Sequence, residues 1–159
     1  MDMKIRPMTA RDKPAVMDIL RHTPEFKPVE VTVAEELCDA YLEDAAASGY
    51  SIFVAEADAA VVGYICYGPT PLTEGTWDIY WIAVLPKHQG QGVGGALLSF
   101  AETQIRQVQG RLVFVETSDM PSYEKTRGFY RSQQYETVCH IPDFYAPGDG
   151  KLTLQKRLR

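Results

Sequence analysis

The residues best suited to chemistry lie in a glycine-rich segment, 89–95, between an apolar stretch at 77–85 and an apolar helical pattern at 93–108. The first N–H groups of a helix have no partner within the helix, and glycine lets a ligand come close to the backbone. This order of strand, glycine turn and helix therefore predicts a binding site for phosphate groups.

The glycines alone are compatible with more than one cofactor. Gly90, Gly92 and Gly95 satisfy the G-x-G-x-x-G pattern of dinucleotide-binding proteins, and Glu116 ends the next predicted strand, where a ribose-binding acid is expected. In those proteins the glycines follow the strand almost directly, whereas residues 85–89 intervene here. Only about 65 residues follow, fewer than a dinucleotide-binding domain needs. A dinucleotide-dependent oxidoreductase is therefore the less favoured interpretation.

The residues that precede the glycines favour coenzyme A. Residues 89–94 fit the pattern Q/R-x-x-G-x-G/A, and Val84-Leu85-Pro86 comes before them. Together they resemble the coenzyme A loop of the GNAT superfamily of N-acetyltransferases. Residues 5–8, 53–64 and 129–136 resemble the family's opening strand, its second hairpin and its late F-Y-x-x-x-G-F-E segment. In the last segment Gln134 replaces the usual glycine and Tyr135 the usual phenylalanine.

This resemblance implies acetyl-CoA as the co-substrate. Its pyrophosphate would accept hydrogen bonds from the loop amides at the positive end of the helix dipole. Its pantetheine arm would lie along residues 82–84 like an extra strand, with the Val84 N–H polarising the thioester carbonyl. The implied cofactor-binding residues are Ile82, Ala83, Val84, Gln89, Gly90, Gln91, Gly92, Val93, Gly94, Gly95, Tyr123 and Thr126.

Acetyl transfer requires a neutral amine, a polarised carbonyl and a proton for the leaving thiolate. Tyr130 aligns with the family tyrosine that protonates the sulfur, and a phenol with a pKa near 10 can donate to a thiolate. Asp78 lies near the position where histone-type members carry a glutamate, and it is the predicted base, directly or through water. Glu74, Glu116 or a water chain are the alternatives for that role.

Hydrophobic periodicity predicts the elements that position these residues. Alternation along 77–85 would place Asp78, Tyr80, Ile82 and Val84 on one face of a strand. Residues 77–117 form a strand–helix–strand unit with a right-handed crossover. Further strands are expected at 3–8, 50–57, 61–67, 112–115, 135–141 and 151–157, helices from Thr9, at 34–48 and at 121–134, and loops at 24–33 and 143–150.

The resemblance implies an α+β fold for a single N-acetyltransferase domain spanning residues 1–159. Its central sheet would be mixed and mostly antiparallel, with six to seven strands, about four helices and one parallel pair inside 77–117. The strand at 77–85 would separate from the strand at 112–115 near its end, so that the pantetheine arm can enter.

The amino-acid composition indicates which binding partners and which cellular location to expect. The chain has 159 residues and a net charge of −5, which disfavours a nucleic-acid partner and favours a cationic amine or simple solubility. Its three cysteines fit no metal-binding spacing, and its residues lead us to expect neither an apolar leader nor a membrane span. These features predict a cytoplasmic protein without a metal.

The sequence does not specify the acceptor or the acyl-chain preference. A small-molecule or peptide amine is expected, and a homodimer follows only from the habit of the family. A non-catalytic module that binds acyl-CoA is the alternative from another functional class. The presence of both Tyr130 and Asp78 argues against that alternative, because such a module needs neither an acid nor a base.

Overall fold

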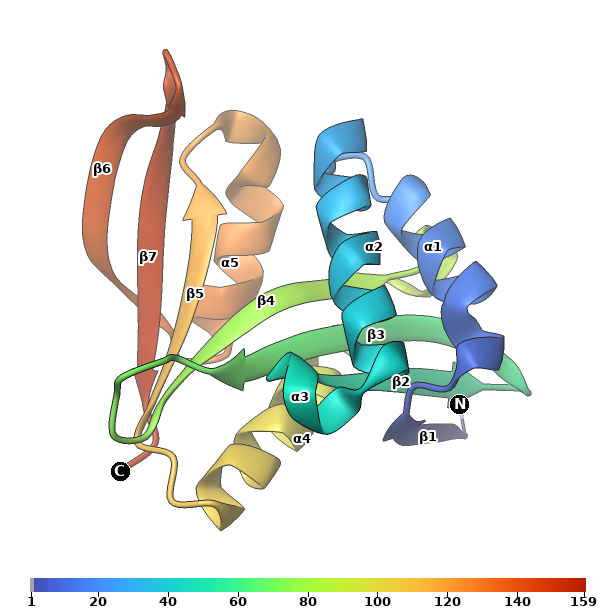
Figure 1. Ribbon diagram of the computed structural model, residues 1–159. Coiled ribbons are helices and arrows are strands. Elements are labelled where there is room, and N and C mark those ends of the chain that lie inside the picture. Colours follow the sequence, from blue (N-terminus) through green and yellow to red (C-terminus); the bar gives the residue numbers. More distant parts are fainter. Residues whose placement is uncertain (1) are drawn as a thin grey trace.

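A seven-stranded mixed sheet forms the centre of the protein, which a computed structural model describes from residue 2 to residue 159. The strand order is β1-β2-β3-β4-β5-β7-β6, and only β4 and β5 run parallel. The α+β fold with one parallel pair is thus confirmed (Figure 1). The strands are β1 (Met3–Pro7), β2 (Ser51–Ala57), β3 (Ala60–Pro69), β4 (Thr76–Val84), β5 (Leu112–Ser118), β6 (Glu136–Ala146) and β7 (Asp149–Arg157).

Five α-helices cover the two faces of the sheet. They are α1 (Lys13–Arg21), α2 (Pro28–Glu43), α3 (Ala45–Ser48), α4 (Val93–Gln107) and α5 (Glu124–Ser132). One core cluster joins α1 and α2 to β2, β3 and β4, and the other joins α4 and α5 to the opposite side of the sheet. In the part of the chain that the structure describes, no helix is both long and apolar enough to cross a membrane.

The second helix begins earlier than its apolar pattern predicted. The expected loop at 24–33 is wrong, because α2 starts at Pro28. Proline is well suited to the first turn of a helix, where its missing N–H costs nothing, so it begins this helix rather than excluding one. The shift matters because it brings the first turn of α2, with Glu30, to the mouth of the cleft described below.

The C-terminal hairpin is also longer than expected. Strand β6 continues to Ala146, so the predicted turn-rich loop at 143–150 shrinks to the tight turn that contains Gly148. Gly148 has a φ of +80°, a conformation that glycine adopts without strain. As a result, Tyr145 on β6 and Asp149 on β7 belong to one hairpin, in which the pairing of β6 with β7 is irregular between Ile141 and Ala146.

A β-bulge in β4 changes which residues share a face. Tyr67 pairs with Ile79 and Cys66 with Trp81, so Tyr80 is an extra residue. Because side chains alternate along a strand, one extra residue reverses the pattern beyond it. Trp77 and Ile79 therefore pack in the same core cluster as Ile82 and Val84, and the predicted common face of Asp78, Tyr80, Ile82 and Val84 is wrong.

Strands β4 and β5 pair only along their first halves. The parallel ladder joins Thr76–Ile79 to Leu112–Val115, and beyond it the two strands diverge (Figure 1). The expected separation of these strands is therefore present in the structure. It leaves the edge of β4 from Tyr80 to Val84 without a neighbouring strand on the β5 side.

The start of the first helical segment is held by a buried carboxylate. Asp12 accepts a hydrogen bond from the Thr9 N–H at 2.7 Å, as a capping-box partner does. The same carboxylate receives two hydrogen bonds from the Arg6 guanidinium, at 2.8 and 2.9 Å. The neighbouring guanidinium lowers the pKa of Asp12 to about 2, so this carboxyl stays ionised at ordinary pH.

Candidate active site

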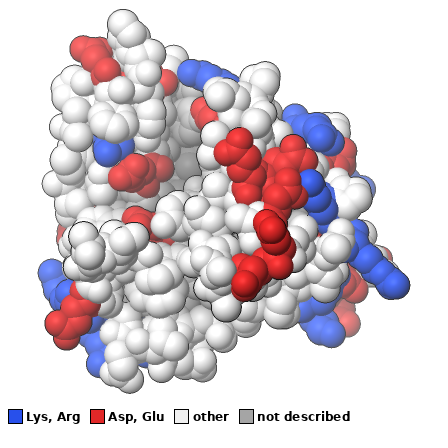
Figure 2. All heavy atoms as spheres, in the orientation of Figure 1, with Lys and Arg blue, Asp and Glu red and all other residues white. Residues whose placement is uncertain are grey.

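A cleft of about 1060 Å³ opens where β4 and β5 diverge. Figure 2 shows its hollow between α2 and the side formed by β5, β6 and β7. The predicted residues that line the cleft are Asp78, Ile82, Ala83, Val84, Gln89, Gly90, Gly92, Val93, Gly94, Gly95, Tyr123, Thr126 and Tyr130. Segments distant in sequence thus meet in one cavity large enough for a cofactor and an acceptor.

The glycine loop presents unpaired backbone donors to the cleft. Gly90 and Gly92 have φ values of +76° and +85°, and a Cβ added at either would meet no atom within 4 Å. Helix α4 makes its first backbone hydrogen bond from the Ala96 N–H to the Gly92 carbonyl, at 3.0 Å. Within residues 2–159, no partner is found for the N–H groups of Gly90, Gln91 and Gly92. The geometry therefore fits a phosphate group at the start of α4.

Gln89 ties this loop to its surroundings through its side chain. Its amide nitrogen donates to the Val84 carbonyl at 3.2 Å, and its amide oxygen accepts from the Lys125 ammonium at 3.0 Å. Gln91, by contrast, is not on the wall of the cleft, and its side chain donates to the Lys87 carbonyl at 3.4 Å. The prediction of Gln91 as a cofactor contact therefore rests on its backbone N–H, for which no partner is found among residues 2–159.

Two residues near the loop were missed by the sequence reasoning. Lys125 brings a positive charge from α5 to the phosphate end of the cleft. His88 also lines the cleft, and its Nδ1 atom is buried without a hydrogen-bond partner among residues 2–159. The available signal for Lys125 was its position one residue before Thr126, which sequence reasoning had already placed near the cofactor.

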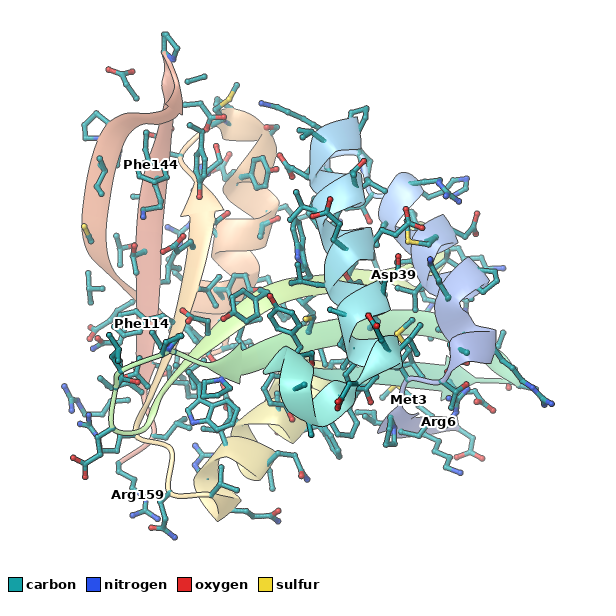
Figure 3. The ribbon with its side chains drawn as sticks, viewed as in Figure 1. Met3, Arg6, Asp39, Phe114, Phe144 and Arg159 are labelled. Atoms are coloured by element: carbon teal, nitrogen blue, oxygen red, sulfur yellow. The ribbon has the colours of Figure 1, made fainter. Side chains whose placement is uncertain are left out.

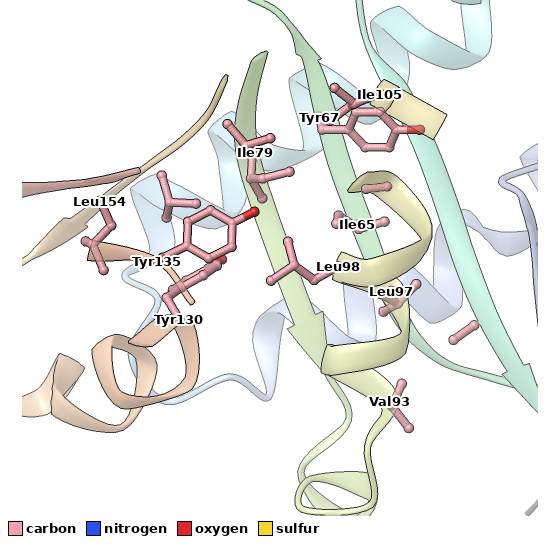
Figure 4. Packing of buried hydrophobic residues seen from close by; sticks show 14 of the residues in the cluster. Ile65, Tyr67, Ile79, Val93, Leu97, Leu98, Ile105, Tyr130, Tyr135 and Leu154 are labelled. Atoms are coloured by element: carbon pink, nitrogen blue, oxygen red, sulfur yellow. The ribbon is translucent and has the colours of Figure 1, made fainter. Parts of the chain in front are cut away.

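Tyr130 is the most enclosed polar side chain of the site. It is 3 % exposed and packs against the rings of Phe129 and Tyr135, at centroid distances of 5.1 and 5.6 Å (Figure 4). Its hydroxyl has no hydrogen-bond partner in the described part of the chain, and burial alone raises its pKa. The phenol is therefore protonated over the physiological range and has a free donor at the cleft.

A buried ionic network supports the ring of Tyr130. Tyr135 donates to the Glu102 carboxylate at 2.8 Å, and the Lys156 ammonium donates to the other oxygen of Glu102, also at 2.8 Å. Gln134, just before Tyr135, adopts a φ of +73°. The two departures from the family pattern therefore keep the turn, because Gln134 accepts the left-handed conformation and the Tyr135 hydroxyl finds a partner.

The three candidate bases lie in different places. Asp78 lines the cleft and accepts a hydrogen bond from the Thr70 hydroxyl at 2.6 Å. Glu116 also lines the cleft, with Lys151 at 3.5 Å from its carboxylate. Glu74 is not on the cleft wall, although its backbone carbonyl accepts a hydrogen bond from Arg111. The geometry thus leaves Asp78 and Glu116 in reach of an acceptor.

Tyr123 lines the cleft, and its hydroxyl contacts the segment around the start of α2. Its hydroxyl donates to the Glu25 carbonyl at 2.9 Å and lies 3.3 Å from the Glu30 carboxylate. It therefore bridges α5 to the segment before α2, at the end of the cleft opposite the loop. Thr126, one helical turn before Tyr130, lines the cleft wall. No group of three or more His, Cys, Asp or Glu side chains that could hold a metal occurs among residues 2–159.

Comparison with known proteins links this cleft to a family. A family model described as an acetyltransferase (GNAT) domain matches residues 48–137, which include β4, the glycine loop and α5. No curated protein sequence matches this chain closely enough to count as a relative.

Solved structures agree with that match. A protein from Desulfovibrio desulfuricans, assigned to the GNAT family of acetyltransferases, shares 39 % identity and a TM-score of 0.95, over 99 % of this chain and 100 % of that one. The ribosomal-protein-S18-alanine N-acetyltransferase from Escherichia coli shares 17 % identity and a TM-score of 0.78, over 99 % and 94 %. An aminoglycoside 6′-N-acetyltransferase solved with coenzyme A shares 17 % identity and a TM-score of 0.76, over 98 % and 97 %. The last two matches show a common fold.

Proposed function

The chain belongs to the GNAT family of acetyltransferases, and we propose that it moves the acetyl group of acetyl-CoA directly to a primary amine of a small molecule. One observation carries this proposal. A loop of unpaired backbone donors and an unpartnered buried phenol, Tyr130, line the same cleft. Phosphate binding at one point and proton donation at another are the two functions that a thioester-using transferase must combine.

The residues of the cleft fit coenzyme A. When bound, acetyl-CoA supplies an activated acetyl group on a thioester. The open positions at Gly90 and Gly92 leave room for a pyrophosphate, and Lys125 adds a positive charge beside them. The unpaired edge of β4 offers Ile82, Ala83 and Val84 to an extended arm, because no strand occupies that edge on the β5 side.

Tyr130 is the proposed acid. A buried phenol is held in its protonated form, and no charged group contributes to its raised pKa. Such a phenol is a weak acid, so its main contribution is a strong hydrogen bond to the thiolate as negative charge develops on the sulfur. As the carbon–sulfur bond breaks, Tyr130 would donate this proton to the sulfur, and it would be reprotonated by the second proton that the nitrogen loses on becoming an amide.

Asp78 is the proposed base. The acceptor must lose one proton before its nitrogen lone pair can attack the acetyl carbon, because an alkylamine is charged at neutral pH. Asp78 lines the cleft with one carboxylate oxygen held by Thr70, which leaves the other free to accept a proton directly or through water. Glu116 is the second candidate for this step.

The test is a comparison of Tyr130→Phe with the wild-type enzyme on a panel of primary amines. Release of the coenzyme A thiol, dependent on the amine, gives turnover, and calorimetry with coenzyme A gives affinity. The variant should lose at least about tenfold in kcat and keep its coenzyme A affinity. Tyr41→Phe, on α2 and away from the cleft wall, is the matched control. Unchanged turnover in Tyr130→Phe would remove this residue from the mechanism.

Wild-type protein that binds coenzyme A but acetylates none of the amines would favour the alternative of a non-catalytic acyl-CoA-binding module. The presence of Tyr130 in the cleft without a hydrogen-bond partner among residues 2–159 argues for the enzyme, because a sensor needs no proton donor at a reacting thioester.

A further inference from the structure

The end of the cleft opposite the glycine loop is lined by more negative than positive charge. Its lining residues come from the start of α2, the end of β5, the end of β6 and the start of β7. Figure 1 shows where these segments lie in the fold. Lys27 is the single lysine lining this end, since Lys125 is bonded to Gln89 at the other. The acidic residues that line the cleft are Glu25, Glu30, Asp78, Glu116 and Asp149.

Asp149 is a buried carboxylate with weak compensation. It is 7 % exposed, and one of its oxygens accepts a hydrogen bond from the Ser118 hydroxyl at 2.5 Å. The other oxygen lies 3.7 Å from the ammonium of Lys27, whose side chain is 61 % exposed. An exposed lysine at that distance adds little to a carboxylate removed from water. A ligand with a positive charge would compensate Asp149 better.

Glu30 faces the same space from the opposite wall and also lacks a full partner. The Tyr123 hydroxyl lies 2.9 Å from the Glu25 carbonyl and 3.3 Å from the Glu30 carboxylate, and its single proton can serve only one of them at full strength. Burial raises the pKa of Glu30, and the nearby charge of Asp149 acts in the same direction. Two carboxylates without full-strength partners thus lie on either side of the cleft.

Tyr145 lines the same cleft as these carboxylates. Burial, together with the charges of Glu116, Asp149 and Glu30, raises the pKa of its hydroxyl to about 12. Glu116 is partly compensated by Lys151, which lies 3.5 Å from it and 4.0 Å from the ring centre of Phe144. Figure 3 labels Phe144 on β6, across the opening from α2. Of these three carboxylates, Glu30 and Asp149 therefore have no ammonium within 3.5 Å among residues 2–159.

Tyr130 supplies an independent sign that the cleft receives a ligand. The Tyr130 side chain is almost fully buried and lines the cleft, and no hydrogen bond of its hydroxyl is found among residues 2–159. Tyr130 lies on α5, whereas Glu30 lies on α2 and Asp149 at the start of β7. The cleft thus has an uncharged place for the reacting amine and an acidic place beyond it.

We propose that the acceptor carries two basic groups, an amine that is acetylated beside Tyr130 and a second, positively charged group held between Glu30 and Asp149. This inference rests on the proposed function, since it concerns the acceptor of the same reaction. The chemistry fits an aliphatic diamine, and it also fits an amino-terminal residue followed by a lysine. Both sources present one neutral and one cationic nitrogen.

The test measures binding by calorimetry to the protein saturated with coenzyme A. In one series 1,4-diaminobutane and 1,6-diaminohexane are compared with 1-aminopentane and 1-aminoheptane, which replace the second ammonium by a methyl group. In the other, alanyl-lysine amide is compared with alanyl-norleucine amide. Each dication should bind at least about tenfold more tightly than the compound that lacks the second ammonium, because a hydrogen bond to a charged group contributes enough free energy for that ratio of affinities. The ratio of the two affinities is compared between the series. The series with the larger ratio shows whether the acceptor is an aliphatic diamine or an amino-terminal residue followed by a lysine.

Three variants locate the effect. Glu30→Gln and Asp149→Asn should each bring the ratio toward one, whereas Glu36→Gln, on the same helix but outside the cleft, should leave it unchanged. If Asp149→Asn does not fold, Glu30→Gln alone decides, since its side chain lies at the cleft mouth. A ratio near one in both series, or no detectable binding of any dication, overturns the inference while coenzyme A binding and acetyl transfer stand. Failure of coenzyme A itself to bind would instead refute the proposed function.

Discussion

The glycine loop allows backbone strain to be separated from cofactor contact by one substitution. Gly92 has a φ of +85°, and a Cβ placed on it meets no atom within 4 Å. Gly92→Ala should therefore lower the free energy of unfolding by only about 1 kcal/mol, because alanine disfavours the left-handed conformation but meets no steric clash. For a protein of this size that loss lowers Tm by roughly 2–4 °C.

The same methyl group has a second effect when coenzyme A is present. It would stand over the N–H groups that the loop offers, and blocking one hydrogen bond to a charged phosphate removes about 1.5–3 kcal/mol. Affinity for coenzyme A should then fall by at least about tenfold. Bound coenzyme A stabilises the folded protein, and this effect can be measured by thermal unfolding at a fixed coenzyme A concentration. For each tenfold loss of affinity, coenzyme A should stabilise Gly92→Ala by about 1.4 kcal/mol less than it stabilises the wild type.

Gly49→Ala is the matched control. Gly49 has a φ of +76°, its added Cβ also meets no atom within 4 Å, and it follows α3 away from the cleft wall. Both variants should lose similar stability without ligand, but Gly49→Ala should keep the full rise in Tm on adding coenzyme A. An equal rise in Gly92→Ala would refute the claim that the loop amides hold the cofactor.

Three further predictions concern stability. Tyr64→Phe should raise the urea unfolding free energy by about 1 kcal/mol, because the fully buried Tyr64 hydroxyl has no partner among residues 2–159; a loss would contradict this account. Lys156→Met should lower the free energy of unfolding by about 3 kcal/mol, because it leaves the buried Glu102 carboxylate without its cation. The double variant Lys156→Met/Glu102→Gln should recover part of this loss. Equal stability of the single and double variants would refute the buried pair. Arg6 lowers the pKa of Asp12 from 3.8 to about 2, so the ionised carboxylate adds about 2 kcal/mol to the free energy of unfolding. This contribution is present above pH ~4 and is lost as the pH falls through ~2. In Arg6→Met, the stability measured against pH should lack this acid step.

The parts of the fold that local sequence decides were predictable. The strand, glycine turn and helix around residues 77–108 could be recognised because turn chemistry and helical periodicity both act over a few residues. The capping role of Asp12 beside Thr9 was visible for the same reason. Each of these features depends on contacts that the chain makes with itself nearby.

The errors arose where tertiary pairing decides. The face of Asp78 could not be read from alternation, because the bulge at Tyr80 exists only in the pairing of β4 with β3. The start of α2 at Pro28 was hidden because proline suits both a loop and a first helical turn. The acidic end of the cleft combines Glu30 and Asp149, which are far apart in sequence and meet only in the folded chain.

A crystal structure of the protein with acetyl-CoA, or with coenzyme A, tests the central claim most directly. The account predicts the pyrophosphate on the N–H groups of residues 90–95, the pantetheine arm along the free edge of β4, and the sulfur within hydrogen-bonding distance of the Tyr130 hydroxyl. A cofactor bound outside this cleft, or a sulfur directed away from Tyr130, would contradict it.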